Sequence, residues 1–201
     1  MDFLYEFDDA MRAGHGDVIC GVDEAGRGPL AGPVCCAAVV LDSTARYSGL
    51  KDSKKLTEAT RERLYDEIIA TATAYSIIMI DNNVIDEINI LKATMLGMKQ
   101  ATENLGISAD LVLVDGNRAP HCGANCMPVV KGDTKSASIA AASVLAKVSR
   151  DRYMQQLDAE FPEYGFAKHK GYPTKMHYLA IDCHGITPYH RVTFLKNRVK
   201  I

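Results

Sequence analysis

Two apolar segments separated by a glycine-rich stretch constrain the fold more than any other feature of the sequence. They cover residues 17–25 (DVICGVDEA) and 32–42 (GPVCCAAVVLD), and each has the length and composition of a β-strand. The glycines between them predict a turn, so the two strands are expected to pair as an antiparallel hairpin. The second segment is apolar from Val34 to Leu41, which is typical of a strand covered on both faces.

The rest of the sequence alternates between helical and strand patterns. Helices are expected at residues 56–72, 83–106 and 136–161 and from Thr174 onwards, and strands at 74–81, 110–117 and 126–133. A last amphipathic segment lies near 189–199. Thr57 is the expected N-cap of the first of these helices, and Gly106 the expected stop of the second. The pattern predicts an α/β fold in which helices flank a mixed β-sheet.

The chain of 201 residues is long enough to bury a core as one domain. We expect a single domain over residues 1–201, with about residues 160–201 forming a small helical C-terminal cap. The first 16 residues lack an unbroken apolar stretch, so no secretory signal is expected. No apolar run approaches the roughly 20 residues that span a bilayer. These features predict a cytoplasmic protein without a membrane segment.

Six cysteines fit that compartment as free thiols. The segment HCGANC (residues 121–126) and the pair Cys183-His184 together offer the ligand types of a zinc site. The CxxxC spacing is loose, however, and the second pair is not in a zinc knuckle. Cysteines packed as small apolar residues are therefore the favoured interpretation.

Basic charge is concentrated near the C-terminus, although the whole chain has a formal charge of −2. Residues 147–201 carry 10 Lys and Arg against 5 Asp and Glu, and residues 1–110 carry 10 against 18. Such a basic region could bind a phosphate backbone, but an ordinary solvated basic face gives the same pattern.

Acidic residues follow or end three of the predicted strands, each close to a glycine. They are Asp23 and Glu24 before Gly26, Asp115 before Gly116, and Asp133 after Gly132. Strand ends in an α/β sheet meet at one edge, where four carboxylates would repel one another unless they were protonated or bound a hard cation. Four carboxylates can hold two Mg²⁺ or Mn²⁺ ions about 3.5–4 Å apart, as in phosphodiester hydrolysis.

Asp23 and Glu24 raise a difficulty, because neighbouring side chains on a strand point to opposite faces. Both can reach one cation only if the strand ends at these residues, and Gly26 and Gly28 would end it. Each acid alone is better explained locally, for example Asp133 as the cap of the next helix. Three coincident acidic strand ends favour a metal site.

Two other classes of protein share some of these features. An actin-like or sugar-kinase phosphotransferase also places Asp-Gly turns around phosphate and metal, but it would need a second lobe. A non-catalytic nucleic-acid-binding module would explain the basic region but not the acids. The stretch GRGPLAG lacks the Lys-Ser/Thr of a P-loop and is not a GxGxxG motif.

The sequence resembles the bacterial ribonuclease HII (type 2 ribonuclease H) family. The resemblance rests on six segments that occur in the family's order: VDEAGRGPLAGPV, GLKDSKKLTE, IDEINILKATMLGM, VLVDGNR, VVKGDTKSASIAAASVLAKVSRDR and YGFAKHKGYPTKMH. It implies an RNase H-like mixed sheet with a C-terminal substrate-binding cap. It also implies cleavage of RNA paired with DNA, including 5′ of single ribonucleotides in duplex DNA, with 3′-hydroxyl and 5′-phosphate ends.

The same resemblance implies roles for individual residues. Asp23, Glu24, Asp115 and Asp133 would be the catalytic acids that bind Mg²⁺ or Mn²⁺, with two ions in the catalytic state. Further residues would contact the substrate: Gly26, Arg27 and Gly28 at the ribose, Tyr172 on the following deoxyribose, and Lys54, Lys55, Ser143 and Lys147 at phosphates or in their support. The 2′-hydroxyl is what distinguishes RNA from DNA at one sugar, and glycines permit close backbone approach to it.

Departures from the family pattern are small. The segment HCGANC lies where members vary, and Thr193 replaces the more usual serine of a His-Arg-x-Ser-Phe motif. The expected partners are RNA–DNA hybrids and DNA duplexes that contain ribonucleotides, bound by a monomer. No obvious box for binding a sliding clamp follows Phe194, so that partnership stays open.

Overall fold

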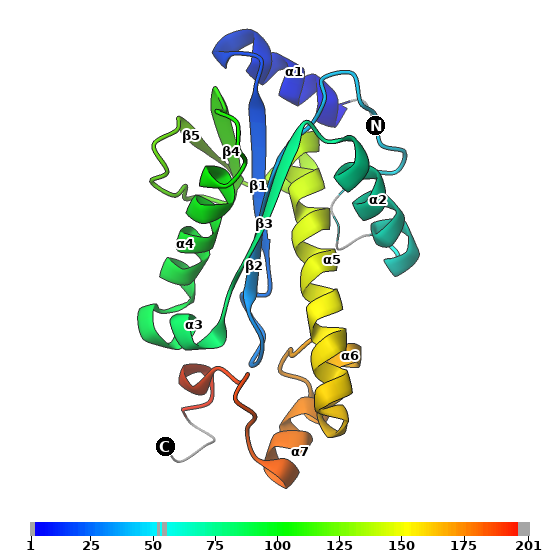
Figure 1. Cartoon of the computed structure of the whole chain (residues 1–201), viewed down its shortest axis with the longest axis vertical. Coiled ribbons are helices and arrows are strands. Elements are labelled where there is room, and N and C mark those ends of the chain that lie inside the picture. Colours follow the sequence, from blue (N-terminus) through cyan, green and yellow to red (C-terminus); the bar gives the residue numbers. More distant parts are fainter. Residues whose placement is uncertain (1–2, 52, 54–55, 197–201) are drawn as a thin grey trace.

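Five strands form one mixed sheet in the order β3-β2-β1-β4-β5, in a computed structural model that describes residues 3–51, 53 and 56–196. The strands are β1 Ile19–Ala25, β2 Val34–Val40, β3 Ala74–Ile80, β4 Leu111–Asp115 and β5 Cys126–Val129. The pairs β1–β2 and β2–β3 are antiparallel, and β1–β4 and β4–β5 are parallel. The predicted mixed sheet and its opening hairpin are therefore confirmed (Figure 1).

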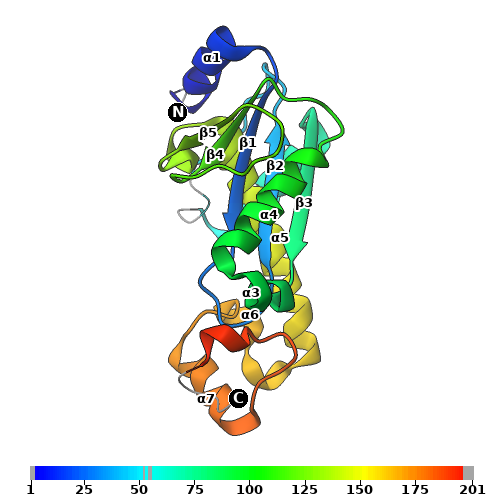
Figure 2. The same cartoon turned by 90° about the vertical axis from the view of Figure 1, so that its left-hand side faces the viewer.

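Helices cover both faces of this sheet (Figures 1 and 2). They are α1 Phe3–His15, α2 Glu58–Thr71, α3 Asn82–Ile88, α4 Ile90–Glu103, α5 Ala137–Glu160, α6 Phe166–His169 and α7 Lys175–His184. Helix α4 packs on one face, with Met98 and Ala101 against Val22 and Val114. Helix α5 packs on the other face and also contacts α2. In the described part of the chain, no helix has the length and apolarity needed to cross a membrane.

The approach of α5 to β1 is unusually close, because small residues line both elements. A Cβ atom added to Gly21 on β1 would lie 2.1 Å from the backbone of Ser138. The first turns of α5 present Ala137, Ala140 and Ala141, all fully buried. The alanine- and serine-rich composition of this helix thus fixes its distance from the sheet.

The helix expected over residues 83–106 is divided into α3 and α4. The break lies at Asn89, which has a φ of 70° and cannot continue a right-handed helix. Its side chain instead accepts hydrogen bonds from the N–H groups of Leu91 (3.0 Å) and Lys92 (3.1 Å), and so caps α4. Helix α4 ends at Glu103, before the left-handed Gly106. Thr57 caps α2, as predicted.

Helix α1 was not expected from the sequence. One of its faces carries Leu4 and Asp8, both buried. The Asp8 carboxylate accepts hydrogen bonds of 2.8 Å from the N–H and the hydroxyl of Ser138 at the start of α5. The buried face of this helix thus includes a carboxylate that is bonded to the start of α5.

Residues 162–196 pack around the far end of α5, at the bottom of Figure 1. Leu157 of α5 belongs to an apolar cluster with Leu30, Phe166 and Leu195. The predicted helix start at Thr174 is confirmed: its hydroxyl caps α7 and lies 3.2 Å from the N–H of His177. In the last amphipathic segment, near 189–199, the described residues contain a 3₁₀ turn, Val192–Phe194.

Candidate active site

The parallel ladder between β1 and β4 stops just before the predicted acids. Its last pair is Val22–Val114, and the next residues on the two strands are Asp23 and Asp115. On its other side, β1 remains paired with β2 as far as Ala25. Strand β1 itself ends at Ala25, directly before Gly26, so the predicted strand end next to Asp23 and Glu24 is confirmed. The strands separate on the β4 side alone, and this opens a space at the acids.

Asp23 is the most buried of the four acids, with 4% of its surface exposed. Burial raises the pKa of its carboxyl well above the usual range, and the negative charges of Glu24 and Asp115 raise it further. Hydrogen bonds from Ser143 and from the N–H of Glu24 oppose this shift. Three of the predicted carboxylates thus interact electrostatically at one place.

Asp133 also lies at this end of the sheet, but in a different structural element than expected. Strand β5 ends at Val129, so Asp133 lies in the following 3₁₀ turn, Gly132–Thr134, and not at a strand end. The N–H of Gly132 donates a 2.6 Å hydrogen bond to Asp115 Oδ1, which fastens this turn beside β4. Asp133 is buried, and the cap of α5 is Ser136 instead.

The carboxylates form a suitable donor set for a hard divalent cation, because their oxygens are the preferred ligands of Mg²⁺ and Mn²⁺. A cation would also compensate the buried negative charge that raises the pKa of Asp23. In the described part of the chain, however, no three His, Cys, Asp or Glu side chains are arranged to hold a metal ion. The Glu24 carboxylate instead lies 3.5 Å from Arg27 Nη1.

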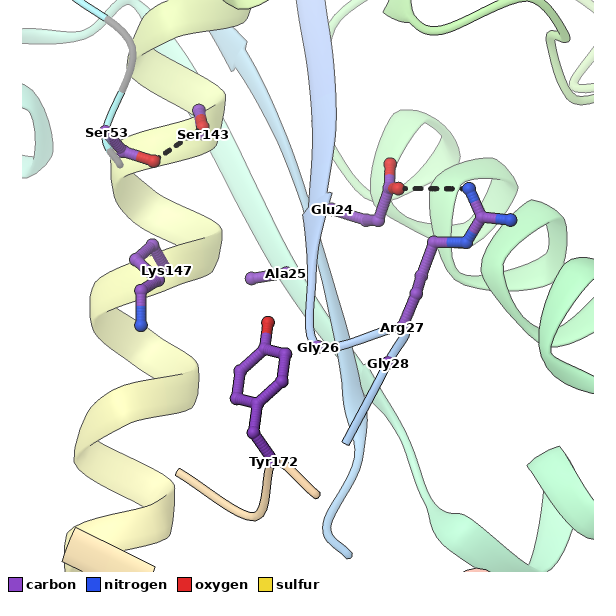
Figure 3. A pocket seen from close by; sticks show the side chains of 9 residues that line it. All are labelled: Glu24, Ala25, Gly26, Arg27, Gly28, Ser53, Ser143, Lys147 and Tyr172. Atoms are coloured by element: carbon purple, nitrogen blue, oxygen red, sulfur yellow. Dashed lines mark hydrogen bonds and ion pairs between the residues drawn. The ribbon is translucent and has the colours of Figure 1, made fainter. Parts of the chain in front are cut away.

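Beside the acids lies a pocket of about 250 Å³ (Figure 3). Its lining comprises Glu24, Ala25, Gly26, Arg27, Gly28, Ser53, Ser143, Lys147 and Tyr172. All of the predicted substrate contacts that the structure describes are therefore brought together in one place. Lys54 and Lys55 lie outside the described residues, although their neighbour Ser53 lines the pocket.

Tyr172 reaches the pocket from the turn before α7, and its ring points towards Ala25 and Lys147 (Figure 3). The residue is 43% exposed, so it is not a core tyrosine. Its backbone is well fixed: its N–H donates to the carbonyl of His169 (2.9 Å), and its carbonyl lies 3.0 Å from His177 Nδ1.

Two pairs of polar side chains lie along α5, on the side of the pocket that this helix forms. The hydroxyl of Ser143 lies 2.9 Å from that of Ser53. The ammonium of Lys147 lies 2.6 Å from both carboxylate oxygens of Asp151, one turn further along the helix. Burial lowers the pKa of Lys147, although Asp151 opposes this effect. Lys147 thus has a fixed position at the pocket.

A second cavity of about 240 Å³ lies on the other side of Glu24 and Arg27. It is lined by β4 residues and their extension, Asp115, Asn117 and Arg118, and by the start of α4. The sequence motif VLVDGNR contains Asn117 and Arg118, but nothing in its pattern indicated that they face the acids. Only the packing of α4 shows this.

Two buried arginines near the glycine loop were also missed. Arg150 and Arg191 are 1% and 0% exposed. Arginine is rarely buried without a partner, so a count of basic residues assigns both to the surface.

The cysteines divide into two groups. Cys20, Cys35 and Cys36 are buried, as predicted, whereas Cys122 and Cys126 are half-buried and Cys183 is exposed. The thiols of Cys122 and Cys126 are 3.0 Å apart. The remaining elements of the zinc hypothesis, Cys183 and His184, lie on α7 in the C-terminal region.

Comparison with known proteins identifies the family of this chain. The profile of the family described as Ribonuclease HII matches residues 20–197. A "Ribonuclease HII" from Caldicellulosiruptor bescii is 57% identical over 179 residues, which cover 89% of this chain and 87% of the relative. The crystal structure of the ribonuclease H2 from Pyrococcus horikoshii is 29% identical with a TM-score of 0.75, over 88% of this chain and 93% of that one. The structure of the PCNA:RNase HII complex from Archaeoglobus fulgidus is 25% identical with a TM-score of 0.76, over 92% and 98%.

Proposed function

The chain belongs to the ribonuclease HII family and is a ribonuclease H endonuclease, and we propose that it nicks duplex DNA 5′ of single embedded ribonucleotides. We further propose that it cleaves the RNA strand of RNA–DNA hybrids and leaves 3′-hydroxyl and 5′-phosphate ends. The family assignment sets aside the kinase and the non-catalytic binding module that the sequence left open.

The observation that carries this proposal is the crowding of Asp23, Glu24 and Asp115 where β1 separates from β4. This acidic end adjoins a pocket that Gly26, Arg27 and Gly28 help to line. Such an arrangement can place a scissile phosphate at the acids and a sugar at the glycines. The 2′-hydroxyl of a ribose would then be within reach of backbone N–H groups.

We propose that Asp23, Glu24, Asp115 and Asp133 hold two divalent cations, Mg²⁺ or Mn²⁺. When bound, such cations supply an activated water and neutralise the charge that develops on the leaving oxygen. The residues of this chain supply the positions: Asp23 is held by the N–H of Glu24, and Asp115 by the N–H of Gly132. Lys147 and Ser143 line the wall where the neighbouring phosphates would lie.

Tyr172 is proposed to pack on the deoxyribose that follows the ribonucleotide. Its exposed ring and fixed backbone support this role, because an aromatic face can contact a sugar at little cost in conformational entropy. We also propose that the protein acts as a monomer in the cytoplasm. Gel filtration with light scattering at micromolar concentration tests the monomer, and a dimer would contradict it.

The decisive experiment offers the purified protein a labelled DNA duplex with one ribonucleotide, in Mg²⁺, Mn²⁺ or EDTA. We expect one nick on the 5′ side of the ribonucleotide with either cation and none with EDTA. Treatment of the product with phosphatase identifies the 5′-phosphate. Cleavage in EDTA, or equal cleavage of an all-DNA duplex, would contradict the proposed function. Asp23→Asn is the matched inactive control.

A further inference from the structure

The guanidinium of Arg191 is buried beneath the glycine loop and donates hydrogen bonds to that loop's carbonyls. Nη1 donates to the carbonyl of Arg27 (2.9 Å), and Nη2 donates to those of Gly26 (2.7 Å) and Gly32 (2.9 Å). Nε donates to Gly32 as well, at 3.0 Å. Arginine is suited to this task, because its five N–H groups radiate in one plane from a group that stays charged.

These contacts fix the orientation of two peptide groups, and therefore the directions in which their N–H bonds point. In a trans peptide the C=O and the N–H of the next residue point in opposite directions. The carbonyls of Gly26 and Arg27 point at Arg191, so the N–H groups of Arg27 and Gly28 point away from it. Both residues line the pocket of about 250 Å³. The geometry points to Arg191 as the positioning residue that aims these two N–H groups into the pocket, and so sets the discrimination between ribose and deoxyribose.

Arg191 is itself held rigidly from several directions. Its N–H donates to the carbonyl of Leu30 (2.7 Å), and its guanidinium lies 5.2 Å from the centre of the Phe194 ring. The next two residues are clamped by Asp86 of α3, which accepts from the N–H of Val192 (2.7 Å) and of Thr193 (3.0 Å). The hydroxyl of Thr193 also donates to Asp86, so the serine-to-threonine departure at this position keeps the donor.

Gly26 has a complementary role in the same arrangement. Its φ of +93° lies in the left-handed region, and a Cβ there would lie 1.9 Å from Arg150 Nε. Arg150 donates to the carbonyls of Pro33 and Ala31 on one side and to that of Lys170, two residues before Tyr172, on the other. Arg150 therefore holds the loop at Ala31 and Pro33, whereas Arg191 holds it at the carbonyls of Gly26 and Arg27.

The inference rests on the proposed function, so the test begins with the wild-type protein. Selectivity is measured as the ratio of kcat/KM for a duplex with one ribonucleotide to that for the same all-DNA duplex, and the Kd for the all-DNA duplex is measured separately. A wild-type protein that cuts neither duplex, or both equally, overturns the proposed function, and with it the basis for this role of Arg191.

The variant is Arg191→Lys, which keeps the charge but cannot span the three carbonyls. Leu157→Ala is the matched control, because it removes buried apolar contacts from the same C-terminal region, and a leucine side chain cannot hydrogen-bond the carbonyls of Gly26 and Arg27. Both are assayed at a temperature where circular dichroism shows them folded. We expect Arg191→Lys to lower kcat/KM at the ribonucleotide by about ten- to a hundredfold. The Kd for the all-DNA duplex should stay within about twofold, and the control should keep normal selectivity.

Equal losses in Arg191→Lys and Leu157→Ala would show that Arg191 only stabilises the region, and would overturn the inference while leaving the proposed function intact. If Arg191→Lys does not fold, Asp86→Asn provides the second measurement. It weakens the clamp on Val192 and Thr193 and leaves the guanidinium in place. A smaller loss of selectivity, with normal affinity for the all-DNA duplex, supports the role of Arg191, and unchanged selectivity contradicts it.

We also propose that Cys122 and Cys126 form a reversible disulfide. This proposal does not depend on the proposed nuclease function. Their sulfurs are 3.0 Å apart, close enough to bond after small side-chain rotations. Cys126 is fixed at the start of β5, opposite Val112, whereas Cys122 lies in the preceding loop. Neighbouring residues of this loop, Arg118–His121, line a cavity of about 550 Å³ against α4.

The reaction can proceed with a low-molecular-weight disulfide such as glutathione disulfide as the oxidant. The Cys122 thiolate attacks one glutathione sulfur, breaks the S–S bond and releases one glutathione thiolate. The Cys126 thiol loses its proton to solvent and attacks the Cys122 sulfur, which releases the second glutathione. One glutathione disulfide is reduced to two thiols as two protein thiols are oxidised to one disulfide.

Intact mass spectrometry after incubation with glutathione disulfide tests this proposal. We expect the wild type to lose two hydrogens, with peptide mapping to Cys122–Cys126, and to regain them with dithiothreitol. Cys126→Ser should stop at a glutathione adduct on Cys122. The exposed Cys183 supplies the control, since Cys183→Ser should still form the disulfide. A stable glutathione adduct on Cys122 in the wild type, without the internal bond, would overturn it.

Discussion

Tyr172 and Gly28 face each other across the pocket: a Cβ atom on Gly28 would lie 3.6 Å from Tyr172 Cε1. The aromatic ring comes from the C-terminal region and the glycine from the β1–β2 connection, so the two are 144 positions apart in the sequence. Both residues line the pocket beside the acids.

Removal of the Tyr172 ring should affect catalysis more than stability. Tyr172→Ala is expected to lower cleavage at a single ribonucleotide by roughly ten- to a thousandfold, because a scissile bond misplaced by about 1 Å can cost about a hundredfold. Tyr172→Phe, the matched control, keeps the ring face and should retain more activity. The residue is 43% exposed, so Tm should change by less than about 2 °C. Several degrees lost in Tm with normal turnover would contradict the sugar-packing role.

Neutralising Asp23 should abolish activity and stabilise the metal-free protein. Asp23→Asn removes a carboxylate whose folded-state pKa is raised by burial, Glu24 and Asp115. An acid with a raised folded pKa binds protons more tightly when folded. Its ionisation therefore destabilises the fold as the pH rises from its unfolded-state pKa to its folded-state pKa. In EDTA at pH 7 the variant should therefore melt a few degrees above the wild type. This difference in Tm should shrink as the pH falls towards the ordinary Asp pKa. An Asp23→Asn variant that is as active as the wild type in Mg²⁺ would refute the site.

Affinity for the duplex should fall steeply with salt, because lysines and arginines release counterions from phosphates. Lys168 is exposed, whereas the ammonium of Lys170 donates to the carbonyl of Ala167 (2.7 Å) and Lys170 has a φ of 51°. Lys168→Ala should therefore weaken binding to every sequence and lower the salt slope by about 1, without moving the cut. Lys170→Ala should also lower stability. Arg63→Gln on α2 is the control, and an equal effect there would argue against this placement of the nucleic acid.

The protein should lose stability as the pH falls from about 6.5 to about 4. Burial lowers the pKa of both His177 and His190 from 6.5 to about 4, and their Nε2 atoms lie 3.0 Å apart. The unfolded chain therefore binds more protons across this interval, so the free energy of unfolding rises with pH there. One pKa unit corresponds to about 1.4 kcal/mol, so the loss should reach a few kcal/mol.

Urea unfolding followed by circular dichroism at pH 7, 6 and 5 measures this slope. Asp23 contributes a slope of opposite sign over an overlapping range, so the measurement is best made in the Asp23→Asn background. The double variant His177→Gln/His190→Gln is the control and should flatten the curve. An equally steep curve in that variant would assign the pH dependence to other groups.

Several features of the protein could be derived from local sequence. The hairpin of β1 and β2, the mixed sheet, and the caps at Thr57 and Thr174 follow from side-chain periodicity and from hydroxyls that bond to backbone N–H groups nearby. The glycine loop and its acids were also recognisable, since their residue types are unusual in a strand. These signals depend on interactions within a few residues of the chain.

Other features depended on contacts that the sequence pattern does not encode. The break at Asn89 needs a side chain that caps α4 from a left-handed backbone, and the buried face of α1 contains the charged Asp8. The position of Asp133 beside Asp115 depends on one hydrogen bond from Gly132 across 17 positions.

The sequence by itself determined which side chains could perform the chemistry, because carboxylates, glycines and an aromatic ring are recognisable by type. The tertiary structure alone decided that β1 leaves β4 at Asp23, before β1 itself ends at Ala25, so that the strands separate beside the acids. It also decided that Arg150 and Arg191 lie under the loop and not on the basic surface. The physical reason is that burial and the directions of backbone carbonyls arise from segments that meet only after folding, so no local pattern records them.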